Sequence, residues 1–172
     1  MTQPQNPQLR VVIDNSVLVA ILRHRNPGNN WLIQLWTTGI IVPLASQETI
    51  HELEEKLIEH SPMSDFYLAT KFVAAAMRRY EPWCERIEPQ SNELNPKCQD
   101  PEDQKFIDLA FAGNVSVLIT RDAKLLEMDT QTPFDITEDH HLRNRMITKG
   151  NDILNSRQSP SALKPYNSIA KL

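Results

Sequence analysis

An apolar run that stops at a carboxylate is the feature that most constrains how this chain can fold. Residues 11–13 are Val, Val and Ile, Asp14 follows them, and a second apolar run begins at Val17. A short, continuous β-branched run is typical of a strand buried on both faces, as in a parallel sheet. The second run fits a helix entered through Asn15 and Ser16, two favourable N-cap residues. Asp14 would then lie at the carboxyl end of the first strand, where open α/β sheets bind ligands, or it would only cap the helix.

Strand-like and helix-like segments alternate along the rest of the chain. We expect further strands at residues 39–45, 85–88, 116–120 and 145–148, and helices at 17–22, 31–38, 46–60, 64–79, 100–112 and 150–156. This alternation predicts an α/β fold, a three-layer α/β/α arrangement with a mostly parallel central sheet.

Length, charge and cysteine content narrow the class of protein. The 172 residues suit one domain, which we place at residues 9–155, between a flexible leader at 1–8 and a tail at 156–172. A net charge of −4 is not that of a protein that binds nucleic acid by charge alone, although an enzyme can attract phosphate through a bound metal. Without a signal peptide, Cys84 and Cys98 indicate reduced thiols in the cytoplasm. No apolar run is long enough to span a membrane.

Four acidic residues from distant parts of the chain are predicted to meet at one edge of the sheet. Asp14 and Asp122 each follow a strand, Asp103 lies in the first turn of one expected helix, and Glu52 lies in the second turn of another. In a parallel α/β fold, the ends of the strands and the starts of the next helices share one edge. We therefore expect these four carboxylates to converge.

Helical periodicity places two of these acids differently relative to the apolar faces of their helices. Asp103 projects along the apolar face of its helix, where a carboxylate is costly without a partner, although a role at the helix dipole is the alternative. Glu52 projects away from the apolar face of its helix and could simply pair with Lys56 in solvent. Periodicity alone also leaves three rivals for its role, Glu48, Glu54 and Glu55.

Converged carboxylates raise one another's pKa and oppose folding unless a cation neutralises them. A few hard oxygen ligands, which leave coordination positions for water and phosphate, suit Mg²⁺ or Mn²⁺. Such a site can support in-line displacement at a phosphodiester. Two other aspartate-based classes fit less well. A phosphatase of the haloacid dehalogenase type needs Asp-x-Asp, but Ser16 holds its second position, and a receiver domain needs an acidic pair where the chain has Asp14-Asn15.

Four motifs resemble those of the PIN domain nucleases. They are Asp14-Asn15-Ser16 after the first strand, Ser46 leading to Glu52-Leu53, the segment DPEDQKF containing Asp103, and Thr120-Arg121-Asp122 after a later strand. The resemblance covers about residues 9–155 and is closest to the bacterial branch described as toxin components of toxin–antitoxin pairs. It also prefers Glu52 to its three rivals.

The resemblance implies a PIN-like fold and metal-dependent cleavage of single-stranded RNA that leaves a 5′-phosphate and a 3′-hydroxyl. Its implied residues are Asp14, Glu52, Asp103 and Asp122 as catalytic acids and ligands of Mg²⁺ or Mn²⁺, Ser16 as a hydrogen-bonding support, and Asp100 and Glu102 as outer carboxylates. Arg121 is a candidate for phosphate contact because it lies next to Asp122. The implied partners are RNA and an antitoxin protein. The alternative is a PIN-like module that binds RNA or regulates without turnover.

Several other segments carry two interpretations each. Residues 23–25, Arg-His-Arg, could contact phosphate or form a solvated helix end, and Lys105 and Lys124 are further candidates for phosphate contact. His140-His141 is predicted to lie in an exposed polar loop rather than to bind a metal. The expected helix at 64–79 is rich in alanine and aromatic residues, so it would form either a homodimer face or part of the core.

Overall fold

The computed structural model describes residues 8–23, 30–90 and 92–157, with side chains up to residue 148. Its strands are β1 (Leu9–Ile13), β2 (Ile41–Ala45), β3 (Glu85–Arg86), β4 (Val117–Ile119) and β5 (Asp135–Thr137). Its α-helices are α1 (Asn15–Leu22), α2 (Trp31–Thr37), α3 (Gln47–Glu59), α4 (Phe66–Met77), α5 (Gln104–Ala112), α6 (Ala123–Leu126) and α7 (Asp139–Arg157). Short 3-10 turns are η2 (Glu81–Trp83), η3 (Pro101–Asp103) and η4 (Asp129–Gln131).

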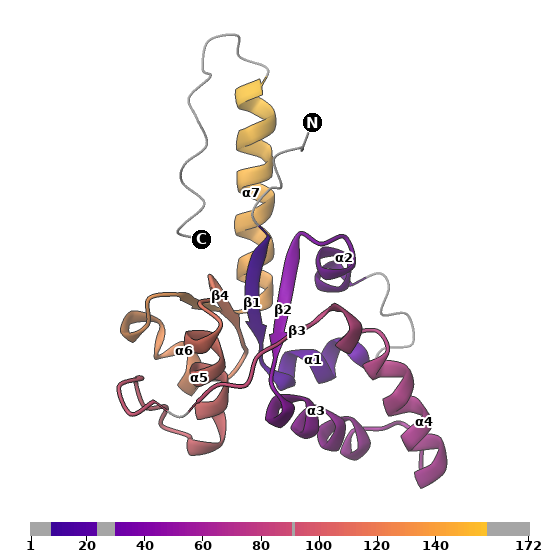
Figure 1. Ribbon diagram of the computed structural model, residues 1–172. Coiled ribbons are helices and arrows are strands. Elements are labelled where there is room, and N and C mark those ends of the chain that lie inside the picture. The colour runs from indigo at the N-terminus through magenta and orange to yellow at the C-terminus, as the bar shows by residue number, and fades with distance from the viewer. Residues whose placement is uncertain (1–7, 24–29, 91, 158–172) are drawn as a thin grey trace, which may run out of the picture.

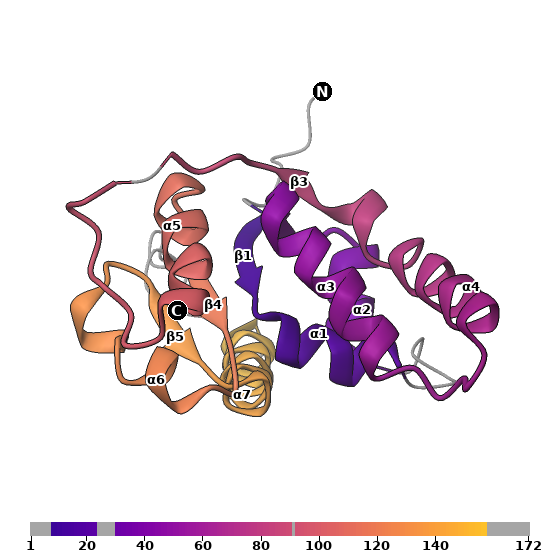
Figure 2. The ribbon, with the colours of Figure 1, turned by 90° about the horizontal axis from the view of Figure 1, so that it is seen from below.

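A parallel sheet forms the centre of the fold, with the strand order β3-β2-β1-β4-β5 (Figure 1). The central strand β1 alternates its side chains between the two faces, as the two-residue period of a strand requires. Val11 and Ile13 pack with α1, α2, α3, α4 and the start of α7, whereas Val12 packs with α5 and α6. Figure 2 shows α5 and α6 on one side of β1, and α1, α3 and α4 on the other. The predicted three-layer α/β fold with a parallel sheet is confirmed.

Short polar side chains begin the helices at the carboxyl edge of the sheet. Asp14 caps α1 by accepting a hydrogen bond from the backbone N–H of Ser16, and Asp122 caps α6 in the same way. Ser46 caps α3 and forms a reciprocal capping box with Thr49. These caps satisfy backbone N–H groups that have no partner inside the helix. Each cap therefore also fixes where its helix starts relative to the strand before it.

The C-terminal part of the domain differs from the sequence prediction. The strand expected at 145–148 is wrong, and the helix expected at 150–156 is the last part of a longer helix, because α7 runs without interruption from Asp139 to Arg157. A helix tolerates Gly150 at a cost of about 1 kcal/mol, so glycine alone does not end it. The fifth strand is instead β5, where Ile136 pairs with Leu118 of β4. Three residues carry little propensity of their own, so pairing with β4 creates this strand.

Three further expectations concern the ends of the chain, the membrane and α4. The leader at 1–8 and the tail at 156–172 lie outside the described residues, apart from residue 8 and the last two residues of α7. Within the described part, no helix is long and apolar enough to cross a membrane. In α4, Ala69, Val73, Ala76 and Met77 are buried, whereas Phe66, Tyr67 and Leu68 are exposed. Core packing thus explains one face of α4, and the homodimer stays a prediction.

Candidate functional site

The carboxyl edge of the sheet brings three of the predicted acids together. Asp14 and Asp122 follow the adjacent strands β1 and β4, and Asp103 ends η3, directly before α5. The backbone N–H of Asp14 donates to the carbonyl of Ile119 at 2.9 Å, which extends the β1–β4 pairing to the edge. The charges of Asp14 and Asp122 both raise the pKa of Asp103. The three aspartates therefore share one electrostatic environment, although they come from positions 14, 103 and 122.

Asp14 is held rigidly at this edge. Its side chain is buried, and its Oδ2 accepts hydrogen bonds from Ser16 Oγ at 2.6 Å and from Thr120 Oγ1 at 2.8 Å. The predicted support by Ser16 is thus present. Thr120 is a residue that the sequence analysis did not single out as a support. Its Oγ1 also accepts from the backbone N–H of Asp122 at 2.9 Å, so one hydroxyl links two of the acids.

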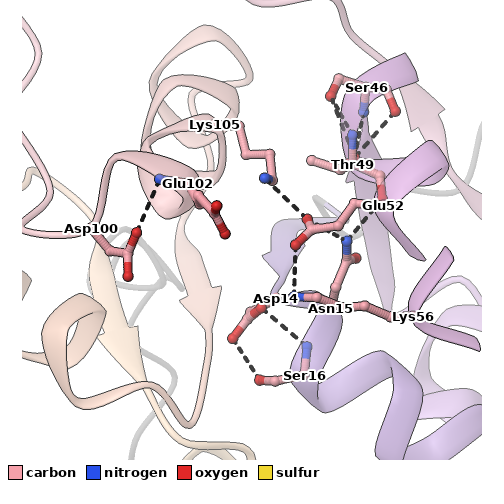
Figure 3. Close-up of polar contacts among 10 residues, drawn as sticks. All are labelled: Asp14, Asn15, Ser16, Ser46, Thr49, Glu52, Lys56, Asp100, Glu102 and Lys105. Atoms are coloured by element: carbon pink, nitrogen blue, oxygen red, sulfur yellow. Dashed lines mark hydrogen bonds and ion pairs between the residues drawn. The ribbon is translucent and has the colours of Figure 1, made fainter. Parts of the chain in front are cut away.

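Glu52 reaches the same edge from α3 but is surrounded by cations. Lys56 donates to its Oε1 at 2.6 Å, and Lys105 of α5 lies 3.2 Å from its Oε2. Asn15, next to Asp14, donates to the same Oε2 at 2.9 Å. Figure 3 shows Glu52 between these three side chains, with Asp14 and Ser16 beside them. The expected pair with Lys56 exists, but the carboxylate of Glu52 faces the edge of the sheet and the Glu52 side chain is only 18% exposed.

The other glutamates of α3 lie elsewhere. Glu48 and Glu55 are exposed, and Glu55 pairs with His51 on the outer face of the helix. Glu54 lines a separate pocket between α3 and α4. The geometry therefore favours Glu52 as the acid of α3 that belongs to the edge.

Asp103 carries the unusual electrostatics of this site. Asp100 caps η3 and Pro101 follows it, as the helix-dipole alternative for Asp103 supposes, but the side chain of Asp103 makes no capping hydrogen bond to α5. Burial raises its pKa to about 6, with further contributions from the negative charges of Asp14, Asp122 and Asp100, and Lys56 opposes them. The edge therefore holds more negative charge than its own lysines neutralise.

Replacing Asp103 with asparagine is expected to stabilise the metal-free protein at pH 8. The pKa of Asp103 is about 6 in the folded protein, against an ordinary value of 3.8. Its contribution to the free energy of unfolding is therefore complete below pH 3.8 and is lost as the pH rises through 6. Thermal melts in EDTA should show a higher Tm for Asp103→Asn at pH 8 and no gain below about pH 4.

Asp108→Asn in the same helix is the control for this prediction. Asp108 Oδ1 accepts hydrogen bonds from Asn95 and Gln104, so its replacement removes good acceptors and brings no gain at pH 8. An equal gain for Asp103→Asn at both pH values would contradict the assigned repulsion.

The basic residues predicted to contact phosphate are mostly engaged. Arg121 forms two 2.8 Å hydrogen bonds with the two carboxylate oxygens of Asp139, and Lys124 Nζ lies 3.0 Å from Asp100 Oδ2. Asp139 therefore engages the Arg121 guanidinium in a bidentate pair, which is a strong kind of ion pair, and the phosphate contact of Arg121 stays a prediction. A contact across 18 positions leaves no local signal in the sequence. Asp100 and Glu102 come from the segment that leads into α5, and Figure 3 shows them to the left of Asp14.

A second group of metal-binding residue types lies after β5. Among the described residues, Glu138, His140 and His141 bring their ligand atoms within 4.8 Å of one another, whereas the four acids are spread more widely. The loop predicted around His140-His141 is wrong, because both residues lie in the first turn of α7, although both are exposed. Hard carboxylate oxygens suit Mg²⁺ or Mn²⁺, and imidazoles suit softer ions. The donor set at the sheet edge is therefore the one that fits Mg²⁺ or Mn²⁺.

Comparison with known families agrees with the fold. The PIN domain model matches residues 10–124, which is more than half of the chain and includes all four acids. No curated protein matches the chain at a significant level. PIN domains are generally nucleases and typically use divalent metals. The chain belongs to the PIN domain family.

Proposed function

We propose that this protein is a metal-dependent endoribonuclease that cleaves single-stranded RNA at the carboxyl edge of its sheet. The observation that carries the proposal is the group of Asp14, Asp103 and Asp122 at one edge of the sheet, where burial and then the negative charges of the other two aspartates raise the pKa of Asp103 to about 6. A fold that keeps three repelling carboxylates at one edge gains when a divalent cation binds there. Structural stability alone gives no reason for such an arrangement.

Asp14, Asp103 and Asp122 would hold the metal, with Glu52 as the fourth ligand. When bound, Mg²⁺ or Mn²⁺ would activate water and stabilise the charge that develops on the phosphate oxygens. The residues of the chain would orient these groups. Ser16 and Thr120 hold the Asp14 carboxylate in one orientation. Asn15 similarly holds Glu52.

Lys56 and Lys105 would be the positively charged side chains of the protein beside the reacting groups. Both lie against Glu52. The hydrogen bond and the charge of Glu52, with smaller effects of Asp14 and Asp103, raise the pKa of Lys56, so Lys56 is positively charged beside the site. An ammonium group there can attract an incoming phosphodiester. Hydrolysis would break the bond between phosphorus and the 3′ oxygen, leaving a 5′-phosphate and a 3′-hydroxyl.

We also propose a biological setting that is more specific than membership of the PIN domain family. We infer that the nuclease acts in the bacterial cytoplasm and that an antitoxin protein restrains it as its partner in a toxin–antitoxin pair. The support is the resemblance of its motifs to that branch of the family. The exposed residues Phe66, Tyr67 and Leu68 at the start of α4 offer an apolar surface for a partner or for a homodimer.

End-labelled single-stranded RNA tests the proposed activity directly. The native chain should cut it in Mn²⁺ or Mg²⁺ and should not cut it in EDTA, because the carboxylates alone cannot activate water. Product ends should be a 5′-phosphate and a 3′-hydroxyl. A folded protein that binds RNA but cuts none of several RNAs in either metal would instead support the alternative, a PIN-like RNA-binding module.

A further inference from the structure

A pocket between α1 and α3 leads away from the acidic edge. Its volume is about 300 Å³, and its lining residues are Ser16, Val19, Ala20, Arg23, Lys56 and His60. Two of these residues also contact the acids of the edge. Ser16 Oγ donates to Asp14, and Lys56 Nζ contacts Glu52. The pocket, which we call the α1–α3 pocket, is therefore continuous with the candidate active site.

Positive charge is distributed unevenly on the two sides of that site. On the β4 and α6 side, carboxylates neutralise both cations, since Arg121 pairs with Asp139 and Lys124 pairs with Asp100. On the α1 and α3 side, Arg23 and His60 have no carboxylate partner within the part of the chain that the structure describes. An anionic strand that crosses the acidic edge therefore meets an unpaired cation in this direction.

We propose that the α1–α3 pocket binds a phosphate of the RNA strand next to the bond that is cut, with Arg23 as its main contact. The proposal rests on the proposed nuclease function and adds the path of the substrate. A guanidinium donates two parallel hydrogen bonds to a phosphate, and Lys56 and the Ser16 hydroxyl lie in the same pocket. Contacts to phosphate position a strand without reading its sequence, so the pocket sets the register of the RNA and not its base preference.

Arg23 also has a matched control elsewhere in the chain. Arg23 is the C-cap residue of α1, and Arg78 is the C-cap residue of α4. Both arginines are exposed, and Arg78 lines the separate pocket between α3 and α4. Removing either side chain costs the fold little and removes one positive charge, but only Arg23 adjoins the acidic edge.

Fluorescence anisotropy with a short single-stranded RNA tests the proposal in the Asp14→Asn background and in EDTA, so that the RNA is not cut during the measurement. Adding Arg23→Ala should weaken binding about tenfold at low salt, as expected for one charged hydrogen-bonded contact. The slope of log K against log salt should become shallower by about 0.7, the value for one phosphate of a single strand. Arg23→Lys should restore the slope but only part of the affinity, because an ammonium keeps the charge and loses the two parallel hydrogen bonds. His60→Ala should weaken binding less than Arg23→Ala, and Arg78→Ala should leave both affinity and slope unchanged.

The outcomes separate this proposal from the nuclease proposal. If the native chain cuts RNA in Mn²⁺ but Arg23→Ala binds with unchanged affinity and slope, the path through the α1–α3 pocket is overturned and the nuclease stands. Equal losses of RNA affinity for Arg23→Ala and Arg78→Ala would show a general effect of charge, and they would also overturn the proposal that the α1–α3 pocket binds a phosphate. If the native chain neither binds nor cuts RNA, the proposed function fails and the pocket proposal fails with it.

Discussion

Asp14→Asn is expected to reduce RNA cleavage by at least about a hundredfold, because even the outer partners of metal ligands cost tenfold to a hundredfold when changed. Asparagine caps a helix as well as aspartate does, so the start of α1 should persist. Its side-chain oxygen can still accept from the backbone N–H of Ser16, as the carboxylate does. The substitution therefore keeps the cap of α1 but removes one negative charge from the acidic edge and the acceptor of the hydrogen bonds from the Ser16 and Thr120 hydroxyls. Cleavage of end-labelled RNA in Mn²⁺ measures the effect.

Metal binding gives this prediction a readout that does not depend on activity. Mn²⁺ should raise the Tm of the native chain, since an ion that binds only the folded state stabilises it. The rise should largely disappear in Asp14→Asn. His140→Ala is the control, because it disrupts the other group of metal-binding residue types, at Glu138, His140 and His141. If His140→Ala loses the Mn²⁺ effect and Asp14→Asn keeps it, the nuclease metal has been assigned to the wrong residues.

Phe106→Ala is expected to lower the free energy of unfolding by about 3–5 kcal/mol, the usual cost of emptying a buried aromatic site. Phe106 is fully buried in the cluster that joins α5 to Val12 of β1 and Leu118 of β4. The same helix begins next to Asp103, so this packing also sets the position of that acid. Urea denaturation followed by circular dichroism measures the loss.

Phe66→Ala is the matched control for the core substitution. Phe66 begins α4 and is 72% exposed, so the same change of residue should alter the free energy of unfolding by less than about 0.5 kcal/mol. A similar loss at both positions would mean that Phe66 packs against something in solution, such as a second copy of the chain. A small loss at Phe106 would contradict the packing of α5 against the sheet.

Local patterns in the sequence were sufficient to predict most of the framework. The apolar run before Asp14 predicted β1 as a buried strand, because a strand covered on both faces needs apolar residues at every position. Ser46 predicted the start of α3, because its hydroxyl satisfies a backbone N–H that the helix leaves free. Strands that alternate with helices predicted the parallel sheet. From that topology it followed that Asp14, Asp103 and Asp122 would share an edge.

Tertiary contacts decided what local patterns could not. The short strand β5 exists because Ile136 pairs with Leu118, and α7 continues through Gly150 where local propensity predicted a break. The choice of Glu52 within α3 depends on Asn15 and on Lys105 of another helix.

The partners of the site residues also come from distant parts of the chain. Thr120 holds Asp14 across 106 positions of the sequence, and Asp139 occupies Arg121 across 18. Periodicity and capping are properties of neighbouring residues, so local patterns predicted the inner strands, the starts of the helices after them and the edge at which the acids gather. Ion pairs and hydrogen bonds between distant segments exist only after the chain has folded. Only the tertiary structure therefore decided which charges at that edge are neutralised and which remain available for a ligand.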